Sequence, residues 1–416
     1  MQSSPSPAGG QRSLRHLWAP ILGLGLTQLI GWGTSFSALT VLGEPIAREL
    51  HLAREQAFGG ITVMLLVSAV LAPNFGRRID ADGARRLMVP GTLVGAVALL
   101  VIAAAQGAYS YWLGWAIFGL AVAMMLTNAA VPALVQIAGP DARRAVTATT
   151  IITGITSVVF LPLTSWLEQV VGWRITLLMF SLLYLVVCLP IHLAVLPHQR
   201  PARVPMGDAN SLVSWEGQLP ETRRRIGFWL LALWMALQGL VVWGFNIQVI
   251  NILEGVGLSH AAAIGVWMLS GPAQAAARVA DLASGGRSAV MSMALLASAM
   301  APLGFAVVLF SGASIPAAAV LAIAFGMGQG LYAVARNLVP LRLFGLKTYG
   351  TTMGQLTLPL NLSSAAAPLI FSIVVTRAGA GAAMWLAAAA GLLSFIAVLV
   401  LNRIAAVASP GSDLRN

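Results

Sequence analysis

Between two long apolar segments the chain reads Gly76-Arg-Arg-Ile-Asp80-Ala-Asp-Gly83-Ala-Arg85-Arg86. A weaker copy, whose aspartate lies 201 residues after Asp80, reads Ala277-Arg278-Val-Ala-Asp281-Leu-Ala-Ser-Gly-Gly-Arg287. Two such polar turns at matching places in two apolar halves predict a duplicated membrane bundle. Parallel repeats of this kind are typical of transporters, whose substrate site lies between the halves.

The composition indicates that lipid covers most of the surface. Of the 416 residues, 58% are hydrophobic and only 9% are charged, and the mean hydropathy is +0.85. A soluble protein of this length needs a more strongly charged surface. A helix needs ~20 apolar residues to cross a ~30 Å hydrocarbon core. Twelve segments meet this requirement, at residues 17–43, 54–75, 87–106, 111–138, 145–167, 174–196, 227–253, 260–282, 288–310, 314–341, 350–375 and 381–404.

The expected fold class is therefore an all-α membrane protein with twelve transmembrane helices in two pseudosymmetric six-helix bundles. Further pairs support the repeat, because Gln28 and Trp32 of the first span correspond to Gln238 and Trp243 of the seventh. A polar stretch with prolines between the halves is typical of a linker. The expected organisation is a disordered cytoplasmic tail at 1–16, bundles at 17–197 and 227–404, the linker at 198–226 and a cytoplasmic tail at 405–416.

The net charge of +11 would suit a nucleic-acid partner, but its distribution argues against one. With both termini inside, twenty of the twenty-four lysines and arginines fall on the cytoplasmic side. That asymmetry follows the positive-inside rule, so the charge sets the topology in the bilayer. Nearly all basic residues are arginine, which favours a GC-rich bacterial genome. We therefore expect a multi-pass protein of the bacterial inner membrane with both termini in the cytoplasm.

The polar stretch after the second span resembles the signature Gly-x3-Asp-x2-Gly-x-Arg-Arg of the major facilitator superfamily (MFS). The resemblance covers essentially the whole chain, and there is a looser similarity to bacterial monocarboxylate and oxalate/formate-type porters. It implies the MFS fold, alternating access and function as a monomer. The second copy departs from the signature, because Ala277 replaces a glycine and one residue is inserted before Arg287. The signature positions here are Gly76, Asp80, Gly83, Arg85 and Arg86.

The signature residues also have a physical rationale as a gate. Gly76 and Gly83 permit a tight turn and a close helix approach. Asp80 is suited to pair with an arginine or to cap a neighbouring helix N-terminus. Such a contact would hold one conformation closed and break in the other. We place Arg278 and Asp281 in the same gate, and the competing interpretation is that these basic turns only set topology.

Arg336 in the tenth span is the most informative single residue within the membrane. Its alignment with Asn128 of the fourth span places both ~16 Å from the cytoplasmic ends of their helices. A charge at that depth costs ~2.5–3.5 kcal/mol, so it should face a partner or a wet cavity. The guanidinium fork is suited to a carboxylate. The alternative is that the helix ends earlier and Arg336 reaches the interface.

Polar and aromatic residues at similar depth in other spans are the expected neighbours of Arg336. Each amide needs hydrogen-bond partners in a dry bundle, so any one of them can instead serve helix packing. The substrate-binding set predicted with Arg336 is Asn128, Trp32, Gln28, Trp243, Asn246, Gln274 and Asn361, and Gln329 and Asn337 lie at the same depth.

These features predict a secondary active transporter that moves a small organic anion by alternating access. No aspartate or glutamate lies clearly at mid-membrane, so coupling to H+ or to a counter-substrate stays open. The alternative is an efflux pump for drugs or other toxic compounds, with a wall formed by Trp32, Met124, Met125 and Trp243. A transporter-like receptor is a further alternative, but it would usually need a sizeable signalling domain, and the tails here are short.

An enzyme is disfavoured, because no nucleophile–base pair appears. The five histidines show no metal-ligand spacing, and no nucleotide-binding motif is present. We therefore expect no metal and no cofactor.

Overall fold

The computed structural model describes residues 17–198, 219–283 and 289–406, and its regular elements there are helical. The first half contains α1 (Trp18–Trp32), a π-helical turn (Gly33–Ser37), α2 (Ala38–Glu49), α3 (Arg54–Asp82), α4 (Arg85–Ala103), α5 (Ala108–Met125), α6 (Thr127–Ala138), α7 (Ala142–Gly154), α8 (Thr156–Leu183), a second π-helical turn (Tyr184–Cys188) and α9 (Leu189–Val195). The second half contains α10 (Glu221–Gly255), α11 (His260–Trp267), α12 (Ser270–Ala283), α13 (Val290–Ser311), α14 (Ile315–Phe344) and α15 (Tyr349–Ala406).

The helices are long and apolar enough to cross a membrane repeatedly. Eight helical segments of the described chain meet that criterion individually. Two of these, 142–195 and 349–405, contain a glycine with non-helical backbone angles at Gly172 and Gly379, and each provides two crossings. The consecutive helices α1 with α2 and α11 with α12 are each long enough together for one further crossing. The arrangement accommodates the twelve expected crossings.

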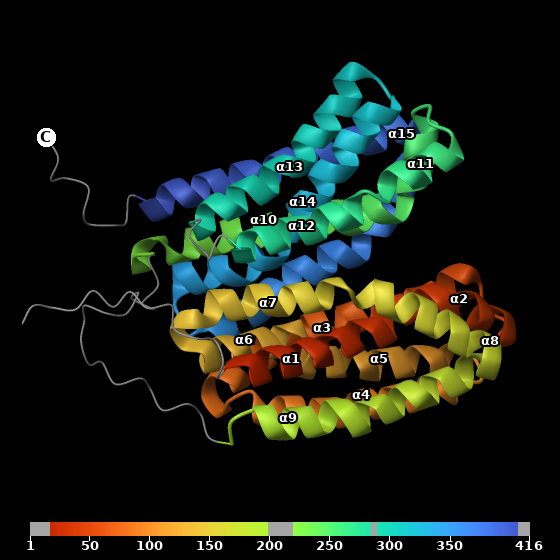
Figure 1. Ribbon diagram of the computed structural model, residues 1–416, viewed down its shortest axis with the longest axis vertical. Coiled ribbons are helices and arrows are strands. Elements are labelled where there is room, and N and C mark those ends of the chain that lie inside the picture. Colours follow the sequence, from red (N-terminus) through yellow and green to blue (C-terminus); the bar gives the residue numbers. More distant parts are fainter. Residues whose placement is uncertain (1–16, 199–218, 284–288, 407–416) are drawn as a thin grey trace, which may run out of the picture.

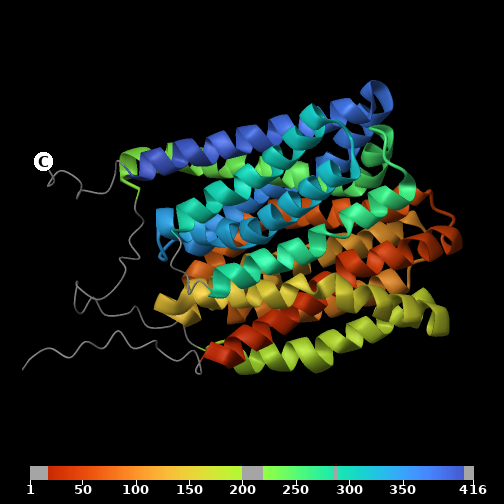
Figure 2. The ribbon, with the colours of Figure 1, turned by 45° about the horizontal axis from the view of Figure 1, so that its top comes forward.

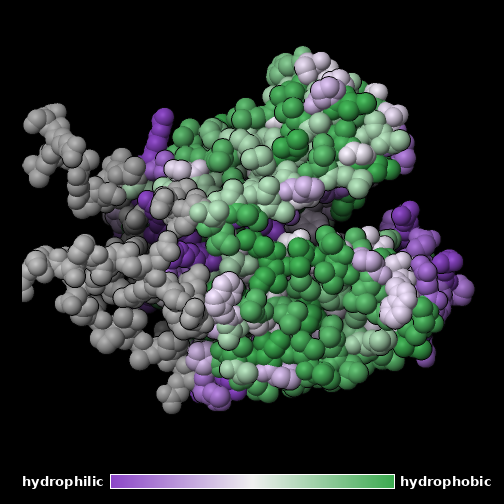
Figure 3. All heavy atoms as spheres, viewed as in Figure 1, coloured by the Kyte–Doolittle hydropathy of each residue, from purple (hydrophilic) through white to green (hydrophobic). Residues whose placement is uncertain are grey.

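The crossings form two groups, α1–α9 and α10–α15, which lie side by side (Figures 1 and 2). The ends of α9 and α15 and the starts of α1 and α10 lie at the same end of the bundle, on the left of these views. We call this the terminal end. At the opposite end Figure 3 shows a notch between the halves, whose outer surfaces are predominantly apolar.

The structure corrects several expected boundaries. The α3 helix continues to Asp82, so Gly76 and Asp80 lie in its last two turns and not in a loop. The α10 helix begins at Glu221, six residues before the expected start of the second bundle at residue 227, and residues 199–218 of the expected linker lie outside the described chain. The eighth span is divided between α11 and α12. The α15 helix extends to Ala406, and the tail residues 1–16 and 407–416 are not described.

Candidate functional site

Asp80 joins the two halves at the terminal end. Its carboxylate accepts hydrogen bonds from the backbone nitrogens of Gly350 and Thr351, at 2.9 and 2.6 Å, and from the Thr351 hydroxyl at 2.7 Å. Both partners belong to the first turn of α15, where the helix dipole favours an anion. Gly76 makes this approach possible, because a Cβ atom there would lie 2.1 Å from the Gly350 carbonyl oxygen.

The second half makes a corresponding contact with the first. The Asp281 carboxylate accepts from Arg143 at 2.9 Å and from the Thr147 hydroxyl at 3.1 Å, both on α7. Its side chain is only 3% exposed, so this ion pair is poorly screened. One turn earlier on α12, Arg278 donates to the Thr150 carbonyl at 2.9 Å.

The two contacts occupy equivalent positions in the internal repeat. Asp80 near the end of α3 meets the first turn of α15, and Asp281 near the end of α12 meets the first two turns of α7. The first contact includes backbone amides and a hydroxyl, and the second includes a guanidinium and a hydroxyl. Both lie at the terminal end, which is therefore the closed end of this conformation.

Other signature residues stay within the first half. Gly83 ends α3 with a φ of +86°, a conformation that favours glycine. Arg85 donates to the carbonyls of Leu193 and Leu196, which fastens α4 to α9. Arg86 pairs with Asp82 at 3.7 Å on the surface. Neither arginine takes part in the contact with the second half that Asp80 makes.

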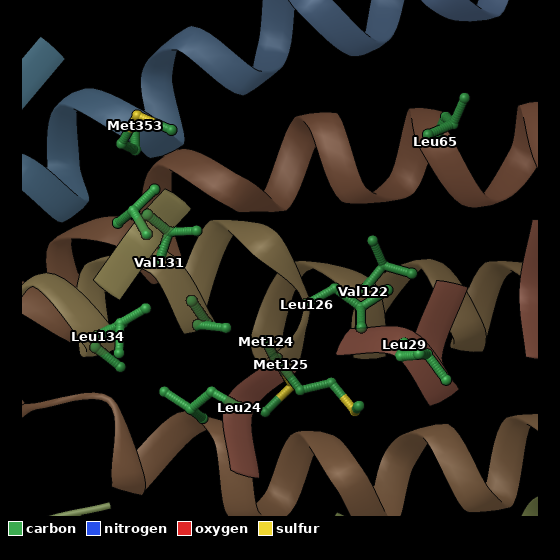
Figure 4. Packing of buried hydrophobic residues seen from close by; sticks show 14 of the residues in the cluster. Leu24, Leu29, Leu65, Val122, Met124, Met125, Leu126, Val131, Leu134 and Met353 are labelled. Carbon is green, nitrogen blue, oxygen red and sulfur yellow. The ribbon is translucent and has the colours of Figure 1, made fainter. Parts of the chain in front are cut away.

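A small cavity of about 40 Å³ lies between the halves. Apolar side chains from several elements line it, and Figure 4 shows three of them, Leu65 of α3, Val122 of α5 and Met353 of α15. Its complete lining is Trp32, Leu65, Val122, Thr127, Asn128, Met235, Arg336, Asn337, Met353, Thr357, Leu360 and Asn361.

Arg336 supplies the positive charge of this cavity. Because α14 continues to Phe344, Arg336 lies eight residues inside the helix, or ~12 Å from its end. The alternative that the helix ends before Arg336 is therefore wrong. Among the described residues Arg336 makes no ion pair, and its buried Nε atom has no hydrogen-bond partner, while the Tyr332 hydroxyl interacts with its guanidinium. Its charged neighbour is Arg278, which repels it.

Amide and hydroxyl groups extend the polar lining from both halves. Asn128 of α6 accepts from the Thr357 hydroxyl of α15 at 2.9 Å, and Asn361 of α15 donates to the Leu65 carbonyl of α3 at 3.4 Å. These bonds cross between the halves at the depth of Arg336. A movement of one half relative to the other would therefore change the lining of the cavity.

Four residues of the predicted binding set do not line the cavity. Gln28 lies behind it and donates to the Met125 carbonyl at 3.0 Å. Trp243 packs on Phe36 of the first half, with ring centroids 4.6 Å apart. Asn246 is exposed and Gln274 partly buried, and neither lines the cavity, because polarity and depth do not determine which face of a helix a residue occupies.

Several lining residues were not predicted from the sequence, notably Thr127, Met353 and Thr357. Thr127 follows a break in the fourth span at Leu126, and the nearest helix-breaking residues, Gly119 and Pro132, lie six or more residues away from it. Met353 and Thr357 are one turn apart on α15, and a repeat-based search could have found Thr357 at a depth similar to that of Asn128. The lining residues Trp32, Asn128, Arg336 and Asn361 were predicted, and their role in binding remains a prediction.

The comparison with family models identifies the class of protein. The model of the Major Facilitator Superfamily matches residues 21–280, more than half of the chain. The chain therefore belongs to this family of membrane transporters, which are generally not enzymes. None of the curated proteins matches it.

Solved MFS transporters have the same fold. The human organic anion transporter MFSD10 (TETRAN) matches with a TM-score of 0.68 and 18% identity, over 91% of this chain and 98% of that one. The transporter FucP in the outward conformation matches with a TM-score of 0.69 and 14% identity, over 93% and 99%. A second FucP structure, of the E. coli fucose:proton symporter, gives 0.65 and 14%, over 93% and 99%.

Proposed function

We propose that this transporter moves a small organic anion by alternating access, with Arg336 as the anchor of the anion. The observation that carries the proposal is the guanidinium of Arg336 in a cavity between the halves, without an ion pair among the described residues. A charge in the membrane interior is costly unless it is compensated, and the guanidinium fork matches a carboxylate. The similarity to MFSD10, an organic anion transporter, agrees with this substrate class.

The closed terminal end and the notch opposite it describe one state of such a cycle. In the proposed orientation, the terminal end faces the cytoplasm of a bacterium and the notch faces outward. Asp80 and Asp281 then hold the cytoplasmic gate closed. Coupling to H+ or to a counter-substrate completes the transport cycle, and the proposed unit is the monomer.

A thermal-shift screen of the detergent-purified protein tests the proposal. It compares monocarboxylates, dicarboxylates, sugars, amino acids and lipophilic drugs on the wild type, Arg336→Ala and Arg77→Ala. Arg77 is exposed near the end of α3, so its removal changes the net charge without touching the cavity. A ligand at 100 times its Kd should stabilise the folded state by ~2.7 kcal/mol. We expect a carboxylate to stabilise the wild type and Arg77→Ala but not Arg336→Ala.

The second candidate is efflux of neutral drugs, and the apolar part of the cavity favours it. Trp32, Met235 and Met353 line the cavity. Met124 and Met125, which were expected in this wall, do not line it and are largely buried in the first-half core. Shifts from neutral drugs alone, retained in Arg336→Ala, would replace the anion proposal with this one.

A further inference from the structure

The fourth span is interrupted beside the cavity. The α5 helix ends at Met125 and α6 begins at Thr127, with Leu126 between them at φ −84° and ψ −155°. This ψ differs by roughly 110° from the helical value, so the following peptide is turned out of the helix. The first amide groups of a helix have no acceptor within it. The amides of Thr127 and Asn128 are therefore available to a group outside α6.

The first span holds this interruption in place. Gln28 donates to the Met125 carbonyl at 3.0 Å, and Trp32 donates through Nε1 to the Thr127 hydroxyl at 3.2 Å. Gly31 leaves room for Leu126, because a Cβ atom there would lie 2.2 Å from the Leu126 Cδ2 atom. Positions 28, 31 and 32 share one face of α1. The break is thus specified by three side-chain positions of a neighbouring helix.

The start of α6 faces the same cavity as Arg336, because Thr127 and Asn128 both line it. A second, independent observation indicates a missing ligand there. Asn337 lines this cavity at 1% exposure, and its Oδ1 atom has no hydrogen-bond partner. Buried polar atoms without partners are rare and indicate a bound molecule or water. A carboxylate has no proton to donate to this oxygen, so a water that donates to both would bridge Asn337 to a bound anion.

We propose that the N-terminus of α6 is a second anion-binding group, which holds one carboxylate oxygen while Arg336 holds the other. Helix N-termini bind anions through free amides and the helix dipole. Because both groups line the same small cavity, one compact charged group placed there would lie between them. Because α6 belongs to the first half and α14 to the second, the bound carboxylate bridges the halves. The inference rests on the proposed anion transport and adds a backbone site to it.

The experiment titrates acetate against the purified transporter and uses acetamide, an uncharged molecule of similar shape, as the control ligand. Two variants isolate the backbone group: Thr127→Val removes the hydroxyl, and Thr127→Pro removes the hydroxyl and the amide proton. Proline is tolerated at the first helical position, and the extended Leu126 suits the residue before it. We expect Thr127→Pro to bind acetate roughly tenfold more weakly than Thr127→Val, as for the loss of a charge-assisted hydrogen bond.

The outcomes separate this inference from the proposed function. Equal acetate affinity of the two Thr127 variants, with binding lost in Arg336→Ala, overturns the α6 site and leaves anion transport intact. Equal binding of acetate and acetamide by the wild type overturns both. Thermal unfolding without ligand checks that Thr127→Pro is folded. If it is not, the α-hydroxy acid counterpart of threonine at position 127 keeps the side chain and replaces the amide N–H by an ester oxygen, and we expect the same weakening relative to the wild type.

Discussion

The carboxylate of Asp80 lies 2.6 Å from the backbone nitrogen of Thr351, so a residue near the end of the second span caps the eleventh. This contact is local in space but joins residues 271 positions apart. It depends on a negative charge at the positive end of a helix dipole and on close backbone approach. These two requirements can be tested separately.

Replacing Asp80 by Asn keeps the shape of the side chain and removes its charge. Because charge-assisted hydrogen bonds are about twice as strong as neutral ones, we expect the ratio of closed to open molecules at the terminal end to fall about tenfold, for a loss of ~1.4 kcal/mol. Spin labels at the exposed positions Arg78 and Lys347 measure the distance between the halves. Asp82→Asn is the control, since Asp82 pairs with Arg86 of its own half on the surface. Identical distance distributions in both variants would contradict the gate.

The close approach is tested at the two signature glycines. Gly76→Ala places a Cβ atom against the Gly350 carbonyl, and we expect it to prevent closure of the terminal end. Gly83→Ala meets no atom within 4 Å, but its φ of +86° strains an alanine. It should therefore lower the free energy of unfolding by about 1–3 kcal/mol without blocking closure. The same spin-label distances and a melting curve distinguish the two effects, and a closed Gly76→Ala protein would sink the steric explanation.

The two-half bundle and its gate could be predicted from the sequence, because the signature motif and its second copy are polar segments within an apolar chain. Composition and span length define the bundle, and the repeat places Asn128 and Arg336 at a common depth. Both line the cavity. The capping of α15 by Asp80 was one of two predicted options, because sequence spacing indicates an anion but does not identify its partner.

The face that each helix turns toward the cavity could not be predicted to the same extent. Asn246 and Gln274 have suitable chemistry at suitable depth, yet they occupy other helix faces. All faces of these spans are apolar, so hydrophobic periodicity does not distinguish lipid from the other half. The break at Leu126 was also missed, because it depends on Gln28 and Gly31 of another span and not on a local helix breaker.

At the end opposite the termini, Glu49 confers a pH-dependent stability. Hydrogen bonds from Arg174, and then from Trp173, hold the pKa of this carboxyl below its usual value of 4.5. The ionised form therefore stabilises the folded state above that value, and the contribution is lost as the pH falls toward the lowered pKa. We expect the wild type to lose more thermal stability than Glu49→Gln between about pH 6 and about pH 4. The side chain is 51% exposed, so high salt should reduce the difference. If the melting temperatures of the two proteins fell by the same amount over this pH range, this contribution would be excluded.

The aromatic contact between Phe36 and Trp243 restricts the cavity on the notch side. Phe36 lies one turn beyond Trp32 along the first span, and its ring contacts Trp243 of the other half at 4.6 Å between centroids. Such a pair contributes ~0.5–1.5 kcal/mol beyond its buried area. We expect Trp243→Ala to increase, severalfold, the rate at which a charged methanethiosulfonate reagent modifies a cysteine introduced at the lining position Leu65.

A second tryptophan of the same half provides the control for this effect. Trp267 packs against Phe245 and Phe325 within the second half, with centroids 5.6 and 5.2 Å apart. Trp267→Ala should lower the melting temperature, because it leaves a gap in that core, but it leaves the Phe36–Trp243 contact in place. If both alanine variants accelerate modification at position 65 equally, loosening of the second half explains the access. If only Trp243→Ala does so, the ring pair controls entry to the cavity that contains Arg336.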